Sequence, residues 1–289
     1  MKLLNTLTAL ATLLPFTTAF YKGFNMAAQN PDGSCRTQAQ WQTAFQNLQK
    51  LPGKFTSVRL YASSDCNTLV NAVPAALATG TQILVGIWTE DSNHYNTEKQ
   101  ALLSAIAAHG NSWILAISVG SEDLYRNDTT ASTLASQIYD VRGMVRAQGV
   151  SAQVGHVDTW TAWVDSSNNA VITASDFIGV DSYPYFQGSS IQSAATTFWN
   201  SIIATRSAVN AVSPGKWVWV TETGWPVSGA KFGAAVASVG NAQTYWRAVA
   251  CQAFTQVHIF WYVESDYWET PSFGVFGKNG KAIYDLYAC

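Results

Sequence analysis

Short apolar runs alternate with longer amphipathic stretches along most of the chain. The apolar runs are rich in β-branched residues and predict strands at residues 20–25, 57–61, 82–88, 114–119, 152–157, 177–181, 217–221 and 258–262. Between them, helical patterns cover residues 38–49, 67–79, 95–109, 130–148, 191–209 and 241–255. Because strands that are apolar throughout are buried on both faces, the pattern predicts a parallel sheet covered by helices.

Eight strand–helix repeats in 289 residues predict an α/β fold, a single (β/α)8 TIM barrel. The alternative is a doubly wound open sheet, which normally carries a phosphate-binding glycine loop. No G-x-G-x-x-G follows the first predicted strand, and no G-x-x-x-x-G-K-[ST] occurs in the sequence. No linker or second module interrupts the repeats, so residues 20–289 are expected to form one domain.

The first residues are typical of a secretory signal peptide. Lys2 supplies the positive charge, an apolar stretch follows, and small residues precede position 20. We therefore expect residues 1–19 to be removed and the mature chain to begin near Phe20. The prediction is a secreted, extracellular or cell-wall protein, with no membrane span and no lipid-anchor signal.

Composition narrows the range of partners. Charged residues make up only 12% of the chain, the net charge is −2, and no basic stripe is visible. This pattern argues against nucleic acid or an anionic membrane as a partner, and a monomer is expected. Aromatic residues reach 13%, with 12 Trp, which suits either flat floors for sugar rings or a large core.

The chain has four cysteines, Cys35, Cys66, Cys251 and Cys289. In a secreted protein an even number favours disulfides, and four cysteines allow three connectivities. We expect Cys35–Cys66 and Cys251–Cys289, because each pair lies in one terminal third of the chain. Asn127 begins the glycosylation sequon Asn-Asp-Thr.

Two glutamates stand out because each comes at the end of an apolar, strand-like run. Glu122 follows the fourth predicted strand and Glu222 the seventh. Active sites of these barrels form at the C-terminal ends of the strands, and two carboxylates there suit acid–base and nucleophilic chemistry on a glycosidic bond. Other polar or aromatic residues at equivalent places are Asn25, Arg59, Tyr61, Trp88, Glu90, Asp158, Asp181, Tyr183, Glu264 and Asp266.

Around these glutamates the sequence resembles glycoside hydrolase family 17, in particular its fungal cell-wall branch of endo-β-1,3-glucosidases and β-1,3-glucanosyltransferases. The segments that carry the resemblance are Val58-Arg-Leu-Tyr-Ala-Ser-Ser-Asp-Cys66, Val85-Gly-Ile-Trp88, Val119-Gly-Ser-Glu-Asp-Leu-Tyr-Arg-Asn127, Thr221-Glu-Thr-Gly-Trp-Pro226 and Phe273-Gly-Val-Phe276. The resemblance implies a retaining mechanism on β-1,3-glucan, with Glu222 as nucleophile and Glu122 as acid/base. The expected substrate-binding residues are Tyr61, Trp88, Ser121, Asp181, Tyr183, Trp225 and Glu264.

The sequence departs from the family pattern at three places. Ser121 stands where the wider clan has an asparagine that contacts the sugar 2-hydroxyl, and Asp181 stands where plant members carry asparagine. After the eighth strand the family's acidic residue could be Glu264 or Asp266, and the lysine that follows it in the family is missing. Arg59 is either a buried charge partner or a substrate contact.

Other functions fit the sequence less well. His156 and Asp158 suggest a hydrolase pair, but no G-x-S-x-G nucleophile elbow accompanies them. The four histidines show no metal-ligand spacing, so neither a metal nor a cofactor is expected. Two alternatives stay open: a non-catalytic glucan-binding wall protein, and a retaining barrel glycosidase of other linkage specificity. The sequence leaves the balance of hydrolysis and glucan transfer open, with Trp261, Tyr262 or Trp268 as candidates for an acceptor side.

Overall fold

A computed structural model describes residues 20–286; the expected signal peptide, 1–19, and residues 287–289 lie outside this range. Eight parallel strands close into a barrel in which each strand pairs with the next and the last pairs with the first. The strands are β1 (Lys22–Asn25), β2 (Ser57–Arg59), β3 (Gln82–Ile87), β4 (Ile114–Ser121), β5 (Gln153–Thr159), β6 (Phe177–Asp181), β7 (Trp217–Glu222) and β8 (Ile259–Trp261).

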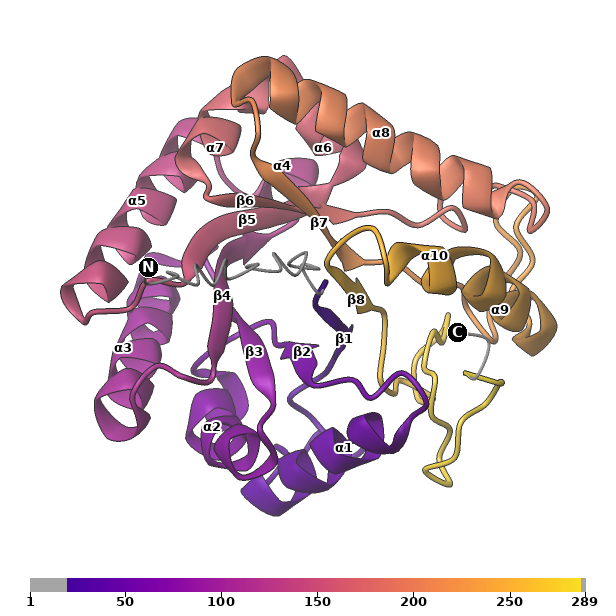
Figure 1. The fold of residues 1–289 in the computed structure, drawn as a ribbon, viewed down its shortest axis with the longest axis horizontal. Helices are drawn as coiled ribbons and strands as arrows, with labels where there is room; N and C mark the ends of the chain where they lie inside the picture. Colours follow the sequence, from indigo (N-terminus) through magenta and orange to yellow (C-terminus); the bar gives the residue numbers. More distant parts are fainter. Residues whose placement is uncertain (1–19, 287–289) are drawn as a thin grey trace, which may run out of the picture.

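Helices form a ring around this barrel (Figure 1). They are α1 (Gln38–Lys50), α2 (Thr68–Thr79), α3 (Ser92–His109), α4 (Asp123–Arg126), α5 (Ala131–Ala147), α6 (Trp160–Val164), α7 (Asn169–Ala174), α8 (Ala194–Val212), α9 (Val239–Tyr245) and α10 (Cys251–Ala253). The turns η1 (Asp65–Asn67) and η2 (Ser166–Asn168) are 3₁₀-helical, and η3 (Trp246–Ala250) is a π-helical turn joining α9 to α10. Among the described residues no helix has the length and apolar character needed to cross a membrane.

The predicted (β/α)8 barrel is confirmed, with two local differences. Between β5 and β6, where no helical pattern was expected, the chain forms α6, η2 and α7. After β8 no helix follows up to residue 286; an irregular C-terminal segment fills the sector between α1 and α9 instead (Figure 1). This segment contains Pro271 and three glycines, which disfavour a helix.

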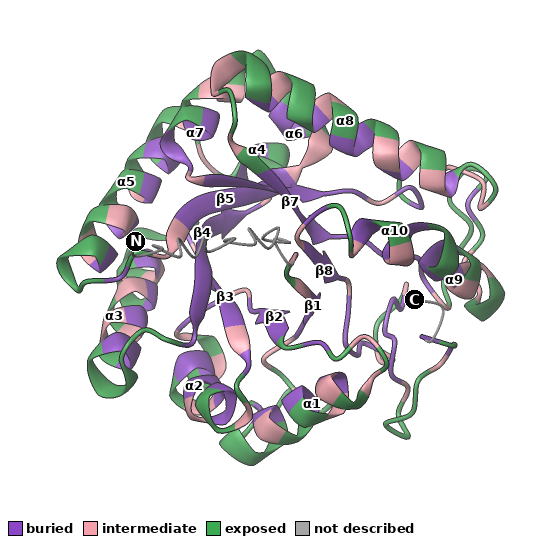
Figure 2. Ribbon diagram, viewed as in Figure 1, coloured by how far each residue is buried: buried purple, intermediate pink, exposed green. Residues whose placement is uncertain are grey.

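The side chains of each strand point alternately to the two faces of the sheet, and the buried apolar residues therefore form two separate clusters. In β3, Ile83 and Val85 belong to the large cluster between sheet and helices, whereas Leu84 belongs to a small second cluster with Phe177 and Phe260. Successive side chains of a strand point to opposite faces, so the small cluster lies inside the barrel. The helices bury their inner stripes and expose their outer ones (Figure 2).

The interior of the barrel changes from apolar to polar along the strands. In β6, Phe177 and Asp181 are four residues apart and therefore point to the same face, inward. Phe177 packs at the N-terminal end of the strand, and Asp181 is its last residue. The same alternation brings Tyr262, two residues after the buried Phe260, to the C-terminal end of the barrel. The polar residues expected from sequence therefore converge at one end.

Local sequence signals set the helix starts. Thr37 caps α1 in a capping box with Gln40, and the carboxylate of Asp91 accepts from two backbone N–H groups at the start of α3. Thr130 caps α5 by accepting a hydrogen bond from the backbone N–H of Thr133. The Asp91 cap explains why α3 begins at Ser92, three residues before the predicted start.

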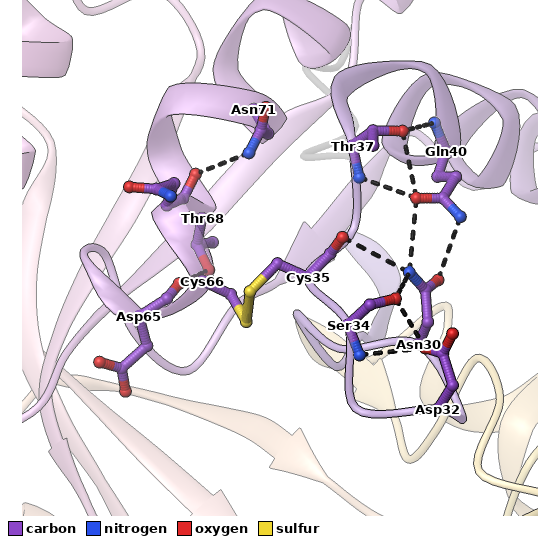
Figure 3. Close-up of a disulfide and its surroundings, with 11 residues drawn as sticks. Asn30, Asp32, Ser34, Cys35, Thr37, Gln40, Asp65, Cys66, Thr68 and Asn71 are labelled. Carbon is purple, nitrogen blue, oxygen red and sulfur yellow. Dashed lines mark hydrogen bonds between the residues drawn. A yellow bond between two sulfur atoms is a disulfide. The ribbon is translucent and has the colours of Figure 1, made fainter.

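The loops that follow β1 and β2 are joined covalently. A disulfide links Cys35 to Cys66, the pairing expected from sequence, and the loop that carries Cys35 is itself held by hydrogen bonds among Asn30, Ser34 and Gln40 (Figure 3). The expected Cys251–Cys289 pair involves a residue outside the described range. The first disulfide fixes two loops at the C-terminal end of the barrel.

Candidate active site

A cavity of about 760 Å³ lies at the C-terminal ends of the strands. Glu122, Asp181 and Glu222 all line it, and one carboxylate oxygen from each lies within 4.8 Å of the others. These residues come from the ends of β4, β6 and β7. The fold therefore brings together the two glutamates that the sequence singled out, with an aspartate beside them.

Glu222, the last residue of β7, is held by hydrogen-bond donors on both carboxylate oxygens. Its Oε1 accepts from Tyr61 Oη at 3.0 Å and from Arg59 Nη1, and its Oε2 accepts from Tyr183 Oη at 2.6 Å. The residue is only 7% exposed. Both oxygens of this carboxylate therefore accept hydrogen bonds, and one of the donors is the guanidinium of Arg59.

Arg59 is the buried charge partner of this site. Its guanidinium also donates to Asn25 Oδ1 at 3.0 Å and to Ser121 Oγ at 2.8 Å. Burial lowers the pKa of Arg59, but the charge of Glu222, the nearby Tyr61 and Asp181 and the hydrogen bond to Glu222 together raise it by more, so the side chain stays cationic. Of the two sequence-based interpretations of Arg59, the structure favours the charge partner.

Asp181 carries an oxygen without a hydrogen-bond partner among the described residues. Its Oδ1 accepts from Thr221 Oγ1 at 2.7 Å, while its Oδ2 is buried and unpaired. Burial, followed by the charge of Glu222, raises the pKa of Asp181 well above its usual range. A protonated Asp181 can donate a hydrogen bond into the cavity.

Glu122 lies in a turn that requires unusual backbone geometry. Gly120 has φ +74°, and a Cβ there would approach Asp123 Oδ2 to 2.2 Å, so glycine is needed. Glu122 itself has φ 60°, and its N–H donates to Val157 O at 2.8 Å. The turn ends β4 and starts α4 with the carboxyl facing the cavity.

The strand β5 anchors α4 through Asp158. The carboxylate of Asp158 accepts from the backbone N–H of Leu124 at 2.9 Å and from that of Tyr125 at 3.3 Å. The wholly buried ring of His156 lies against the same carboxylate, 3.0 Å from Nε2 to Oδ2. The pair suggested by sequence therefore acts as a support for α4, away from the cavity.

The environment of Glu122 favours its protonated form near neutral pH. Burial is the largest cause, followed by the charges of Glu222 and Asp158, and the nearby cation Arg126 opposes them; together they raise the pKa of Glu122 to about 7. Glu222 thus has hydrogen-bond donors on both oxygens, whereas Glu122 holds its proton to a higher pH than an ordinary glutamate. In retaining glycosidases two carboxyl groups about 5–5.5 Å apart, in different environments, act as nucleophile and general acid.

The other residues expected at the site differ in where they lie relative to the cavity. Tyr61, Asp181 and Tyr183 line the cavity, as do Tyr262 and Trp268. Ser121 lies behind it, bonded to Arg59, and Trp88 lies outside the cavity lining beside the guanidinium of Arg126.

Trp225 and Glu264 do not reach the cavity, contrary to expectation. Trp225 is fully buried in the core, packs edge-on against Tyr185 and at a tilt against Tyr245, and donates to Val236 O at 3.0 Å. Trp225 lies three residues after the end of β7, and its large ring fills the core. Glu264 instead accepts from Arg36 at 2.8 Å.

Of the two acidic residues after β8, Asp266 lies at the cavity and Glu264 does not. Asp266 lines the cavity, and its oxygens accept from Ser272 Oγ and from the backbone N–H groups of Phe273 and Gly274 at 2.6–2.8 Å. Asp266 therefore shapes the C-terminal segment at the edge of the cavity. Trp261, another candidate, is buried in the core.

Several aromatic residues of the cavity wall were missed from sequence. They are Tyr125, Trp160, Phe186 and Phe273. Trp160 follows β5 directly and Phe186 lies five residues after β6, so their position after strand ends was an available signal.

His94 lies in a cluster of acidic side chains that the spacing of the histidines in the sequence did not indicate. His94 Nε2 lies 2.8 Å from Asp65 Oδ1 and 3.6 Å from Glu98 Oε1. Glu98 is fully buried, and its oxygens already accept from the backbone N–H groups of Ser63 and Ser64 at 2.6–2.7 Å. The cluster is accounted for by hydrogen bonds that hold the loop after β2.

Comparison with known proteins agrees with this geometry. The chain is 42% identical to a probable glucan endo-1,3-β-glucosidase of Aspergillus fumigatus, over 97% of this chain and 68% of that protein. It is 38% identical to a glucan 1,3-β-glucosidase of Saccharomyces cerevisiae, over 87% of this chain and 84% of that protein. The chain spans about two thirds of the length of the Aspergillus relatives.

A solved structure shows the same fold. A Rhizomucor miehei β-1,3-glucanosyltransferase, an active-site mutant in complex with laminaritriose, superimposes with a TM-score of 0.80 at 29% identity, covering 94% of this chain and all of that one. A second structure of that enzyme, described as a glycoside hydrolase family 17 member, has a TM-score of 0.79 at 28% identity.

The closed barrel with paired carboxylates at the C-terminal ends of β4 and β7 defines the class of barrel glycoside hydrolases. Within this class the chain belongs to the family of the BtgE/BtgC glycoside hydrolase domain, whose model matches residues 23–279. The resemblance to glycoside hydrolase family 17 is confirmed.

Proposed function

We propose that this protein is a retaining glycosidase of β-1,3-glucan, with Glu222 as nucleophile and Glu122 as acid/base. The observation that carries the proposal is the pair itself. The two carboxyl groups approach within 4.8 Å, but donors surround one while burial and negative charge surround the other. A retaining mechanism needs both the short separation and the difference in protonation.

The reaction proceeds in two steps. In the first, a carboxylate oxygen of Glu222 attacks the anomeric carbon, the glycosidic C–O bond breaks, and Glu122 gives its proton to the leaving oxygen. In the second, an acceptor hydroxyl attacks the same carbon and its proton passes to Glu122, while the bonding electrons return to Glu222. Water as acceptor gives hydrolysis, and a sugar hydroxyl gives chain transfer.

The names of the relatives support β-1,3-glucan as substrate and both outcomes of the second step. The Aspergillus relative is named an endo-1,3-β-glucosidase, and the Rhizomucor protein is named a glucanosyltransferase and was solved with laminaritriose. Tyr262 and Trp268 line the cavity and offer aromatic surfaces on which a sugar acceptor can rest. We propose that the protein remodels glucan by cleavage and transfer.

We further propose the processing, oligomeric state, location and glycosylation of the protein from its sequence. Residues 1–19 are the signal peptide, residues 20–289 the catalytic domain, and the mature protein acts as a monomer outside the cell or in the cell wall. Asn127, exposed at the end of α4, is the proposed glycosylation site.

A time course of products from a linear β-1,3-glucan hexamer, run beside Glu222→Gln, tests the function. Early products longer than the hexamer, absent from the variant, establish transfer. Shorter products alone establish endo-hydrolysis. If neither sample changes the hexamer, a panel of β-1,4-linked and other glucans and a pull-down on insoluble glucan distinguish another linkage specificity from a non-catalytic binding protein.

A further inference from the structure

The acid/base glutamate has one close ionic contact, and no part of the mechanism above uses it. Arg126 Nη1 donates to Glu122 Oε2 at 3.3 Å, four residues along the chain and across the single turn of α4. About a third of each side chain is exposed. The contact is therefore at the rim of the cavity, directly on the carboxyl that must exchange a proton.

Other groups hold the guanidinium of Arg126 in place. Its Nε donates to Asp128 Oδ2 at 2.7 Å, and its Nη2 donates to Ser121 O and to Glu90 Oε1, the latter at 3.4 Å. The ring of Trp88 lies 5.7 Å from the guanidinium carbon. These partners come from the loop after β3, the end of β4 and the loop after α4. A planar guanidinium bonded from several directions is a fixed charge.

We propose that Arg126 is a positioning residue that orients the carboxyl of Glu122 and stabilises its ionised form during the second step of the reaction. This inference rests on the proposed function of Glu122. It also gives roles to Trp88 and Glu90, which lie at the site without lining the cavity: they position the arginine.

The charges facing Glu122 explain why such a residue is needed. The anionic or acidic groups are Glu222 from β7, Asp158 from β5 and Asp181 from β6, and the cations are Arg126 from α4 and Arg59 from β2. In the first step the charge of Glu222 helps Glu122 to keep its proton. Once Glu222 is esterified to the sugar that charge is gone, while Arg126 is still in contact. The balance then shifts toward the carboxylate, which is the form that accepts the proton of the incoming hydroxyl.

The variants for the test are Arg126→Gln, Arg126→Lys and a matched control, Arg142→Gln. Arg142 on α5 also combines an ion pair, 3.0 Å to Asp176, with a hydrogen bond to a backbone carbonyl, Val154 O at 3.2 Å. It therefore reports the structural cost of removing such an arginine without touching Glu122. Arg126→Lys keeps a charge near Glu122 but loses the planar fork, and it serves if the glutamine variant does not fold.

In wild-type enzyme the alkaline limb of kcat/KM on the hexamer should fall near pH 7, where Glu122 loses its proton. In Arg126→Gln this limb should move up by about 1 pH unit, because an opposite charge next to the carboxyl is lost. On an aryl β-1,3-oligoglucoside with an activated leaving group, kcat should fall about tenfold or more, since the second step limits the rate. Azide, which attacks without giving up a proton, should restore part of that rate.

The lysine variant should lie between wild type and the glutamine variant, and Arg142→Gln should keep the wild-type pH limb. A fall in rate that is equal at every pH and insensitive to azide would overturn the proposal and leave Arg126 a structural residue of α4.

A second readout separates this proposal from the proposed function. The carboxyl of Glu122 can be titrated by ¹³C NMR in protein labelled at glutamate, with its signal assigned through Glu122→Gln. Arg126→Gln should raise the pKa of Glu122 whether or not a glucan is cleaved, and an unchanged pKa would refute the role of Arg126. If wild-type protein instead cleaves no glucan while the pKa does move, the proposed function fails and the charge coupling stands.

Discussion

The surroundings of Glu222 and of Glu122 are opposite in character although their carboxylate oxygens approach within 4.8 Å. Glu222 lies at the end of a regular strand and receives hydrogen bonds from a buried arginine and two tyrosines. Glu122 lies in a left-handed turn, carries a partly exposed ion pair, and faces other carboxyl groups. Two side chains of the same type therefore have different chemical properties because their neighbouring groups differ.

The two sides also differ in how they are built. The donors to Glu222 come from β2 and from the loops after β2 and β6. Arg59 is fixed further by Asn25, whose amide donates to Thr221 O and Phe260 O. The turn of Glu122 depends on β5, through Asp158 and His156. Changes on one side should therefore alter one of the two glutamates more than the other.

Removing the nucleophile should have the largest effect. Glu222→Gln cannot form the glycosyl–enzyme ester, so the turnover of the β-1,3-glucan hexamer should fall about 10⁴-fold or more. Circular dichroism and thermal unfolding show whether the variant is folded. A folded variant that keeps more than a few per cent of the wild-type rate would refute the nucleophile assignment.

Changing the acid/base should give a loss that depends on the leaving group. Glu122→Ala should lose about 10²- to 10⁴-fold on the hexamer, which needs proton donation, and least on an aryl glucoside with a good leaving group. Azide should restore part of the activity and give a β-glucosyl azide. Equal losses on both substrates, without rescue, would remove the acid/base role from Glu122.

The support of Glu122 should respond to pH. His156 Nδ1 lies 2.7 Å from Val119 O and its Nε2 3.0 Å from Asp158 Oδ2; both oxygens are acceptors, so the ring must be doubly protonated. Burial lowers the pKa of His156, but the hydrogen bond and charge of Asp158, with the charge of Asp123 and the hydrogen bond to Val119, together raise it by more. Stability from this pair is thus fully present below about pH 6.5 and is lost as pH rises through the raised pKa.

His156→Gln should consequently reduce the free energy of unfolding by about 3–5 kcal/mol at mildly acidic pH, because Asp158 stays buried without its charged partner. The difference from wild type should shrink in alkaline buffer. Urea unfolding at both pH values measures it, and a difference independent of pH would contradict the imidazolium assignment.

The smallest effect should come from one donor to the nucleophile. Tyr183→Phe removes the 2.6 Å hydrogen bond to Glu222 Oε2 but leaves Arg59 and Tyr61 in place. A hydrogen bond to a charged group contributes about 1.5–3 kcal/mol, so kcat/KM should fall about 10- to 100-fold. A drop as large as that of Glu222→Gln would show that Tyr183 takes part in the chemistry directly.

The sequence predicted the barrel well because strands that are buried on both faces have continuous apolar sequences. The run before Glu122 and the run before Glu222 each gave a strand close to its observed length. The short helices between β5 and β6 were missed because single turns such as α6 are too short to show a helical period.

The prediction of individual site residues was less complete, since position after a strand does not fix the direction of a side chain. Trp225 and Tyr183 both follow strand ends, yet one fills the core and the other contacts Glu222. Glu264 and Asp266 were indistinguishable because their difference depends on the fold of the C-terminal segment, which holds Asp266 at the cavity. Arg126 was visible in the sequence, but its contact with Glu122 depends on the turn at α4.

The link between Cys35 and Cys66 has a practical consequence for anyone who produces this protein. It links the loops that follow β1 and β2. These strands end at Asn25 and Arg59, so the disulfide stabilises the part of the site that holds the nucleophile. A host compartment that keeps thiols reduced would yield protein without this brace. Expression in an oxidising compartment and purification without thiol reagents are therefore part of obtaining the native enzyme.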